Sequence, residues 1–412
     1  MLRKTMLKQP HLRNLLFTWL VWAVIVIGFP VLLDTRLELK RPDRALSWTP
    51  NETARNSQNG KIYLLDPFMN RQVSWDSEFY LSIATVGYDD PAISVVDIPG
   101  GERLSKNYAF FPMYPYTIRI VRFPLQIFGL TPIATSTLAG VLVSLVGAFF
   151  GMLALFDLAR AELEESGAYR AVFYLLIFPT GFFLAQVYTE GLFIALAFGS
   201  LALARRKQLF WAALLAAFAT WTRALGAVLI IPLALAWLDE TGGWRNFRFS
   251  TQALLRGLLV LVPVLAYAVW YITLGVQHSL VEDHWFGRSF LDMERFSAGV
   301  QFAVEQIMDG GNPQMRAYYL LEFFGVGLAI VACLATLRRY PGVALFGLLG
   351  LAITITTGAP QSLIRYVLVV PSIYIFLSRL GRNTAFDRGW TVFSILLLGM
   401  QLMLFSVDMW VA

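Results

Sequence analysis

Long apolar runs recur along nearly the whole chain and constrain the fold more than any other feature. A helix needs about 20 consecutive apolar residues to cross the hydrocarbon core of a bilayer. The 412 residues are 57% hydrophobic and only 15% charged, whereas soluble domains carry roughly a quarter of charged residues. The sequence therefore predicts an all-α polytopic membrane protein.

The individual runs predict about eleven transmembrane helices in one integral-membrane domain that covers residues 1–412. Several runs are shorter than a full crossing. Broken or half-length helices are tolerated in a bilayer only where protein buries them or where they line a polar cavity. The predicted spans are 15–33, 130–158, 171–186, 188–204, 209–222, 225–238, 253–274, 318–337, 342–358, 362–379 and 390–410.

Basic residues lie in short clusters between the apolar runs, as they do in the cytoplasmic loops of membrane proteins. This arrangement, and not nucleic-acid binding, explains the net charge of +6. We expect an uncleaved first span, because Asp34 and not a small-residue cleavage site follows it. With the basic N-terminus inside, every dense cluster falls in the cytoplasm and the C-terminus lies outside. The clusters are Arg160 and Arg170; Arg205, Arg206 and Lys207; Arg245 and Arg248; Arg338 and Arg339; and Arg379, Arg382 and Arg388.

The connection 34–129 is too long for a simple connector and predicts a large first extracytoplasmic loop. Within it, apolar residues recur at helical spacing: Trp75, Phe79, Ile83 and Val86. This stripe predicts a helix that lies in the membrane interface with its other face in water. Ser74 is the predicted N-cap, and Gly87 is predicted to end the helix. For residues 112–128, an interfacial helix and a short span both remain open.

Four ionisable residues on the predicted outer side stand at helix ends or turns: Asp76, Glu190, Arg223 and Arg365. Each has an ordinary interpretation, because an acid in the first turn complements the helix dipole and an arginine can extend to the interface. Ionisable residues at or within a membrane are costly, however, and favour a functional hypothesis.

The first motif, W-D-x-x-x-Y-x-x-I-A-x-x-G-Y over residues 75–88, resembles the signature of PIG-V-like mannosyltransferases. Residues 110–115, FFPMYP, are similar to the family's F-F-P-L-Y-P, with Met113 in place of leucine. Together these two motifs are specific, and the resemblance covers roughly residues 70–380. Residues 34–72 have no matching pattern, which leaves the acceptor open.

Three later stretches also resemble family motifs. They are YTEGLF at residues 188–193, TRALG at residues 222–226 and the pair Arg365–Tyr366. The resemblance implies a glycosyltransferase of the GT-C superfamily that takes a sugar from a polyprenyl-phosphate carrier. It further implies extracytoplasmic chemistry, a single inverting displacement and a catalytic carboxylate in the first large loop. In eukaryotes, the named member adds the second mannose to the glycosylphosphatidylinositol precursor.

Asp76 is the predicted general base for the acceptor hydroxyl, a role that carboxylates also fill in inverting glycosidases. Arg223 and Arg365 are the predicted ligands of the departing phosphate, with Lys106 and Arg103 as further candidates. For the aromatic residues, a place in the membrane-interface belt is the simpler interpretation. The other predicted substrate-binding residues are Trp75, Glu78, Tyr80, Tyr88, Phe111, Tyr114, Tyr188 and Glu190.

No metal or other cofactor is predicted. Glu282, Asp283 and His284 offer three possible ligands in the outer loop 275–317, but consecutive side chains rarely converge and the chain has no D-x-D triplet. A structural or solvated loop is the preferred interpretation. Cys333 lies alone in an apolar run, so no intrachain disulfide is possible.

Three other functions compete with the transferase hypothesis. A transporter predicts internal repeats and charges near the midplane of broken helices, yet no repeat is visible and few ionisable residues, such as Glu322 and Asp408, fall in the predicted spans. A lipid-linked glycan flippase or ligase, or an inactive structural subunit, would also keep the outer loop. The predicted location is the plasma membrane of a prokaryote, with the endoplasmic reticulum membrane as the alternative.

Overall fold

The computed structural model describes residues 10–36, 42–53, 58–65, 68–243, 250–308, 311–358 and 360–411. Among these residues, five helices are long and apolar enough to cross a membrane: His11–Leu33, Pro132–Leu176, Val262–Phe286, Pro313–Thr336 and Thr384–Ser406. Shorter apolar helices cover Leu209–Thr222, Thr251–Val260 and Pro341–Ile355. The predicted all-α, multi-pass membrane fold is confirmed, and the count of about eleven spans stays a prediction.

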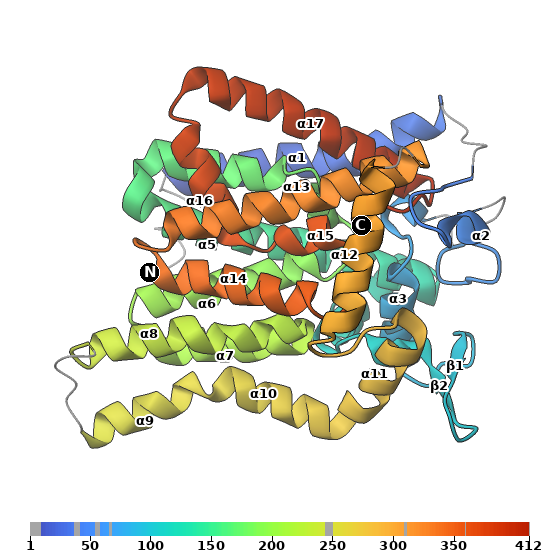
Figure 1. The fold of residues 1–412 in the computed structure, drawn as a ribbon, viewed down its shortest axis with the longest axis horizontal. Helices are drawn as coiled ribbons and strands as arrows, with labels where there is room; N and C mark the ends of the chain where they lie inside the picture. The colour runs from blue at the N-terminus through green and yellow to red at the C-terminus, as the bar shows by residue number, and fades with distance from the viewer. Residues whose placement is uncertain are drawn as a thin grey trace.

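Most helices run roughly along the long axis of the molecule (Figure 1). They are α1 (Pro10–Asp34), α5 (Pro132–Leu176), α6 (Glu190–Arg205), α7 (Leu209–Thr222), α8 (Ile230–Glu240), α9 (Thr251–Val260), α10 (Val262–Trp270), α13 (Pro313–Thr336), α14 (Pro341–Ile355), α16 (Pro371–Leu380) and α17 (Thr384–Ser406). Past α10 the chain stays helical through α11 (Val276–Val281) to Phe286, and α12 (Met293–Met308) then crosses the others. The predicted loop 275–317 is therefore wrong over much of its length.

Two predicted spans are interrupted. Within 171–186, helix α5 ends at Leu176, and only the short 3-10 turn Gly181–Ala185 precedes α6. Within 362–379, the five-residue helix α15 (Leu363–Val367) is separated from α16 by an extended Val370 before Pro371, because the residue before a proline avoids the helical region. Both interruptions are buried in protein, as the bilayer requires of broken helices.

The predicted cytoplasmic clusters meet at one end of the bundle, around acidic residues of α5. Arg206 pairs with Asp157, and both Arg339 and Arg379 pair with Glu162. Beside them, α5 is broken at Glu164, whose φ of 61° is non-helical. These clusters therefore share one end, as predicted; Arg245 and Arg248, like the N-terminal Arg3, Lys4 and Lys8, lie outside the described residues.

The first long loop forms small elements gathered at the other end (Figure 1). They are α2 (Thr49–Thr53), α3 (Ser77–Thr85), the antiparallel strands β1 (Val95–Asp97) and β2 (Arg103–Ser105), and α4 (Met113–Leu125), with Val95 opposite Ser105 in the strand pair. At 13 residues, α4 is too short to cross a bilayer alone, which favours the interfacial alternative for residues 112–128.

Helix α3 differs from its prediction in two respects. It is buried on every side from Ser77 to Ala84, so no face is in water, because α4 and α5 pack against it. Asp76, not Ser74, is its N-cap residue. The predicted end is confirmed, since Gly87 follows the helix with a φ of +144°, a value that side chains disfavour.

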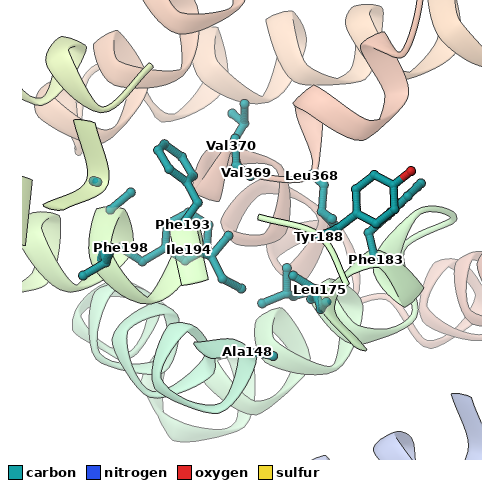
Figure 2. Packing of buried hydrophobic residues seen from close by; sticks show 14 of the residues in the cluster. Ala148, Leu175, Phe183, Tyr188, Phe193, Ile194, Phe198, Leu368, Val369 and Val370 are labelled. Atoms are coloured by element: carbon teal, nitrogen blue, oxygen red, sulfur yellow. The ribbon is translucent and has the colours of Figure 1, made fainter. Parts of the chain in front are cut away.

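The core lies where α5, α6 and the chain between α15 and α16 meet. Figure 2 shows Phe193 and Ile194 of α6 near Val369 and Val370, with Tyr188 beside Phe183. Helices α5 and α6 approach so closely that a Cβ on Gly191 would lie 2.3 Å from the carbonyl oxygen of Ser144. Small residues permit such contact between helices in membranes, and this contact fixes the start of α6.

Candidate active site

The turn that carries Asp76 docks onto the irregular segment before α6. The Asp76 backbone N–H donates to the Tyr188 hydroxyl at 3.3 Å, and that hydroxyl donates to the Ser74 carbonyl at 3.0 Å. Ser77 Oγ donates to the Val187 carbonyl. Trp75, which stands between Ser74 and Asp76 in the chain, has a φ of 51°, a strained value for a bulky residue. Strain of this kind persists only where surrounding contacts enforce it.

Arg365 joins the two acidic motifs. Its Nη1 donates to Asp76 Oδ2 at 3.0 Å, and its Nε lies 3.5 Å from Glu190 Oε1. Its side chain is 8% exposed, against 18% for that of Asp76. Asp76 Oδ1 accepts no hydrogen bond from the described residues, so one carboxylate oxygen remains available beside the most accessible part of the cluster.

Glu190 also pairs with Arg223, whose Nη1 lies 2.9 Å from Glu190 Oε1. Glu190 stands in the first turn of α6 and is fully buried, while Arg223 is the extended residue that separates α7 from the next 3-10 turn. The other carboxylate oxygen of Glu190, Oε2, has no hydrogen-bond partner among the described residues. A buried polar atom without a partner marks a place where a ligand or water can bind.

Aromatic rings surround the two arginines. Arg365 Cζ lies 5.2 Å from the Tyr188 ring and 5.6 Å from the Phe183 ring. Arg223 Cζ lies 4.9 Å from the Tyr366 ring, and Tyr80 packs edge-to-face toward Tyr188. Cation–π contacts stabilise guanidinium groups that have been removed from water, so these rings help the buried charges to stay in place.

The structure thus brings together the four predicted charged residues in one ion-pair cluster, with three predicted aromatic residues beside it. Its charged members are Asp76, Glu190, Arg223 and Arg365, and its predicted aromatic neighbours are Trp75, Tyr80 and Tyr188. Their positions come from the first long loop and from segments more than 100 residues away. The arrangement can hold one anionic and one hydroxyl-bearing group side by side.

The remaining predicted residues lie around the cluster and have partners of their own. Tyr88 donates to the Phe110 carbonyl, Phe111 stacks on Trp270, and Tyr114 is fully buried against Ser144. Lys106 Nζ lies 4.5 Å over the Trp285 ring. Their substrate-binding roles stay predictions.

Glu78 is buried in α3 and forms no ion pair in the described part of the chain. Burial raises the pKa of its carboxyl to about 7, although the charges of Lys61 and Lys106 act in the opposite direction. Burial also lowers the pKa of the Lys106 ammonium. Glu78 therefore titrates near neutrality and does not join the ion-pair cluster.

Residues 20–291 match the family described as mannosyltransferase (PIG-V), which is more than half of the chain. The chain belongs to the PIG-V mannosyltransferase family. The match includes Asp76, Glu190 and Arg223 but ends before Arg365, so the contact between Arg365 and Asp76 shows how a residue beyond the match completes the cluster.

Human GPI alpha-1,6-mannosyltransferase 2 is 32% identical over 161 residues, which are 37% of this PIG-V family chain and 29% of the human protein. Solved structures with a similar course of the chain include the apo Archaeoglobus fulgidus oligosaccharyltransferase, at 13% identity and a TM-score of 0.45, covering 97% of this chain and 56% of that one. ArnT from Cupriavidus metallidurans, bound to undecaprenyl phosphate, has 12% identity and a TM-score of 0.44 over 85% of this chain and 75% of that one.

The C-terminal residues of this PIG-V family chain contact the Asp76 turn, which the sequence did not predict. Ser74 Oγ donates to Asp408 at 2.5 Å, and Trp75 Nε1 donates to the Met409 carbonyl. The Trp410 ring packs edge-to-face on Trp75. The predicted span 390–410 included Asp408, but helix α17 ends at Ser406 and Asp408 follows it.

Glu322 supports Arg365 from α13. Its Oε2 accepts the Ile364 backbone N–H at 2.7 Å, at the start of α15. Tyr318, one turn earlier, accepts both the Ser362 N–H and the Trp410 indole N–H. In the sequence, the position of Glu322 in an apolar run was the only sign of this contact with the start of α15.

The described residues contain no group of three or more His, Cys, Asp or Glu side chains placed to bind a metal. Glu282, Asp283 and His284, predicted in a structural or solvated loop, lie on a helical turn. Asp283 pairs with Arg295 at 2.8 Å.

Proposed function

We propose that this protein is a glycosyltransferase that moves a hexose, mannose in the first instance, from a polyprenyl-phosphate carrier to an extracytoplasmic acceptor. The acceptor is a lipid-linked sugar or another glycan. The observation that carries the proposal is the Asp76–Arg365–Glu190–Arg223 cluster in a member of the PIG-V mannosyltransferase family.

In the proposed reaction, Asp76 takes the proton of the acceptor hydroxyl while that oxygen attacks the anomeric carbon of the sugar. The bond from that carbon to the phosphate oxygen breaks on the opposite face, so the configuration inverts. Oδ1 of Asp76 is the oxygen suited to accept the proton, because Oδ2 is engaged by Arg365.

The departing polyprenyl phosphate needs cationic donors, and a planar guanidinium offers two parallel hydrogen bonds to a phosphate. Arg365 contacts the proposed base directly, and Arg223 is linked to Arg365 through Glu190. We place the site on the extracytoplasmic side of a prokaryotic plasma membrane, because the basic clusters gather at the other end of the bundle and the positive-inside rule puts them in the cytoplasm.

The test is transfer from polyprenyl-phosphate mannose in reconstituted vesicles. We expect wild type to transfer the sugar and Asp76→Asn to lose about 100-fold or more in rate, since a positioned base contributes about that much. Asp97→Asn is the control, because its carboxylate is exposed and pairs with Arg103 in the small strand pair. Movement of an intact lipid-linked glycan without bond cleavage would identify a flippase instead, and uptake of a soluble solute would identify a transporter.

A further inference from the structure

Three arginines converge on one tyrosine, Tyr366. Arg223 Cζ lies 4.9 Å and Arg365 Cζ 5.4 Å from its ring, and Arg288 Nη1 lies 3.5 Å from its hydroxyl oxygen. Arg288 follows the long helix that ends at Phe286, so it comes from a segment that no motif marked.

The three guanidinium groups differ in how far their charge is balanced. Arg365 contacts Asp76 and Glu190, and Arg223 contacts Glu190. Arg288 forms no ion pair within the described residues, and its hydrogen bond to Tyr366 is at the long limit. Glu282 attracts it only at longer range. Most of its five N–H donors are therefore available to an anion.

The Arg288 backbone is nevertheless held firmly. Its N–H donates to the Glu282 carbonyl, and the next N–H, of Ser289, donates to the Thr357 carbonyl at 3.0 Å. Gly287 adopts a φ of +61° to make this turn. Gly358 lies so close that a Cβ there would be 3.1 Å from Arg288 Cγ, so glycine leaves room for the half-buried arginine.

We infer that Arg288, with Arg223 beside Tyr366, binds the phosphate monoester of the polyprenyl carrier. This inference rests on the proposed function and deepens it. Arg365 also contacts two carboxylates and so has fewer donors left for the phosphate, whereas Arg288 offers the paired donors that a phosphate prefers. The tyrosine ring keeps the guanidinium groups apart and in register while the phosphate is absent.

The experiment measures binding of a polyprenyl monophosphate to the full chain in detergent. Arg288→Ala should weaken binding about tenfold or more, because charge-assisted hydrogen bonds contribute about 1.5–3 kcal/mol. Arg288→Lys keeps the charge but loses the planar guanidinium group, so its affinity should lie between those of wild type and Arg288→Ala. Arg295→Ala is the matched control, since this nearby arginine is 47% exposed and already paired with Asp283 and Asp292.

Two competitor lipids identify the source of the phosphate. A polyprenol without phosphate and phosphatidylglycerol should both fail to displace the polyprenyl monophosphate. Equal displacement by either would overturn the inference, because the site would then read the prenyl tail alone or any anionic headgroup. Thermal unfolding checks that each variant is folded. If Arg288→Ala does not fold, the binding of polyprenyl monophosphate by Arg288→Lys tests the inference.

The failure of this inference is separable from that of the proposed function. Unchanged binding by folded Arg288→Ala, with sugar transfer intact, removes Arg288 from the site and leaves the transferase proposal standing. Binding that depends on Arg288 without any sugar transfer by wild type removes the transferase proposal and leaves a polyprenyl-phosphate site.

Discussion

Asp76 and Arg365 are 289 residues apart in the chain, yet Arg365 Nη1 lies 3.0 Å from Asp76 Oδ2. The two elements that carry them are held by further contacts with the C-terminal residues and with α13. An ion pair of two partly buried groups needs close geometry to offset its desolvation cost. The contacts of the C-terminal residues and of α13 therefore help to hold the Asp76 carboxylate in position.

Arg365→Met should destabilise the protein by about 3 kcal/mol, because removing one partner leaves a buried charge without compensation. Adding Asp76→Asn to this variant should recover part of the loss. Unfolding in detergent, followed by intrinsic fluorescence, measures both effects. Arg103→Met is the control and should change stability by less than about 1 kcal/mol, since its ion pair is exposed. A double variant no more stable than Arg365→Met would show that the two residues are not coupled.

Gly191→Ala should destabilise the protein by about 2–3 kcal/mol and lower transfer activity. Its Cβ would lie 2.3 Å from the Ser144 carbonyl oxygen, which forces α6 away from α5 and shifts the neighbouring Glu190. Gly389→Ala is the control, because nothing lies within 4 Å of its added carbon and alanine favours a helix. Unfolding midpoints and initial rates measure both variants. Equal stability of the two would contradict this account of the helix contact.

Trp410→Ala should lower kcat about tenfold or more while the donor KM changes little. The substitution removes the ring contact with Trp75 and the hydrogen bond to Tyr318, so the Asp76 turn loses its support, and small misplacements of a reacting group are costly. Trp211→Ala is the control, because that side chain is 56% exposed on α7. A variant that loses stability but keeps its kcat would assign Trp410 to folding alone.

Stability should fall as the pH rises from about 4.5 to about 7, because the Glu78 carboxyl loses its proton in the unfolded state over this range while the folded state keeps it. Burial raises the pKa of this carboxyl to about 7 in the folded protein, so the folded state binds the proton more tightly than the unfolded state and loses that advantage on deprotonation. Glu78→Gln should remove this slope and be more stable than wild type at pH 8, by at most about 3 kcal/mol.

Unfolding midpoints at pH 5 and pH 8 measure the effect of Glu78. Glu102→Gln, at an exposed turn position between the strands, is the control and should leave the pH dependence unchanged. An identical slope in wild type and Glu78→Gln would show that another group is responsible.

Part of the candidate site was predictable because its signals are local in sequence. Asp76, Glu190, Arg223 and Arg365 each combine a charge with a helix end or turn in an apolar chain, and the structure brings all four together. Arg288 and Trp410 carry no such signal. An arginine in an outer loop or a tryptophan at the end of a span fits any membrane protein, so only their contacts with Tyr366 and Trp75 distinguish them.

Helix boundaries were predicted less well where burial, and not composition, decides them. Residues 171–186 are apolar enough for a span, but the chain leaves the helix at Leu176 because the broken segment is enclosed by other helices. Likewise, the stripe of α3 predicts one buried face, while α4 and α5 cover the other. Packing of this kind depends on segments remote in sequence.

The sequence by itself determined that the chain is a multi-pass helical membrane protein, which charged clusters share one end, and which charged motifs are candidates for the site. Those properties follow from hydrophobicity and charge, which are sums over neighbouring residues. Within the part of the chain that the structure describes, the tertiary structure decided which oxygen of Asp76 accepts no hydrogen bond, which arginine forms no ion pair and which predicted spans are interrupted. These depend on distances between segments hundreds of residues apart, and such distances exist only once the helices have packed.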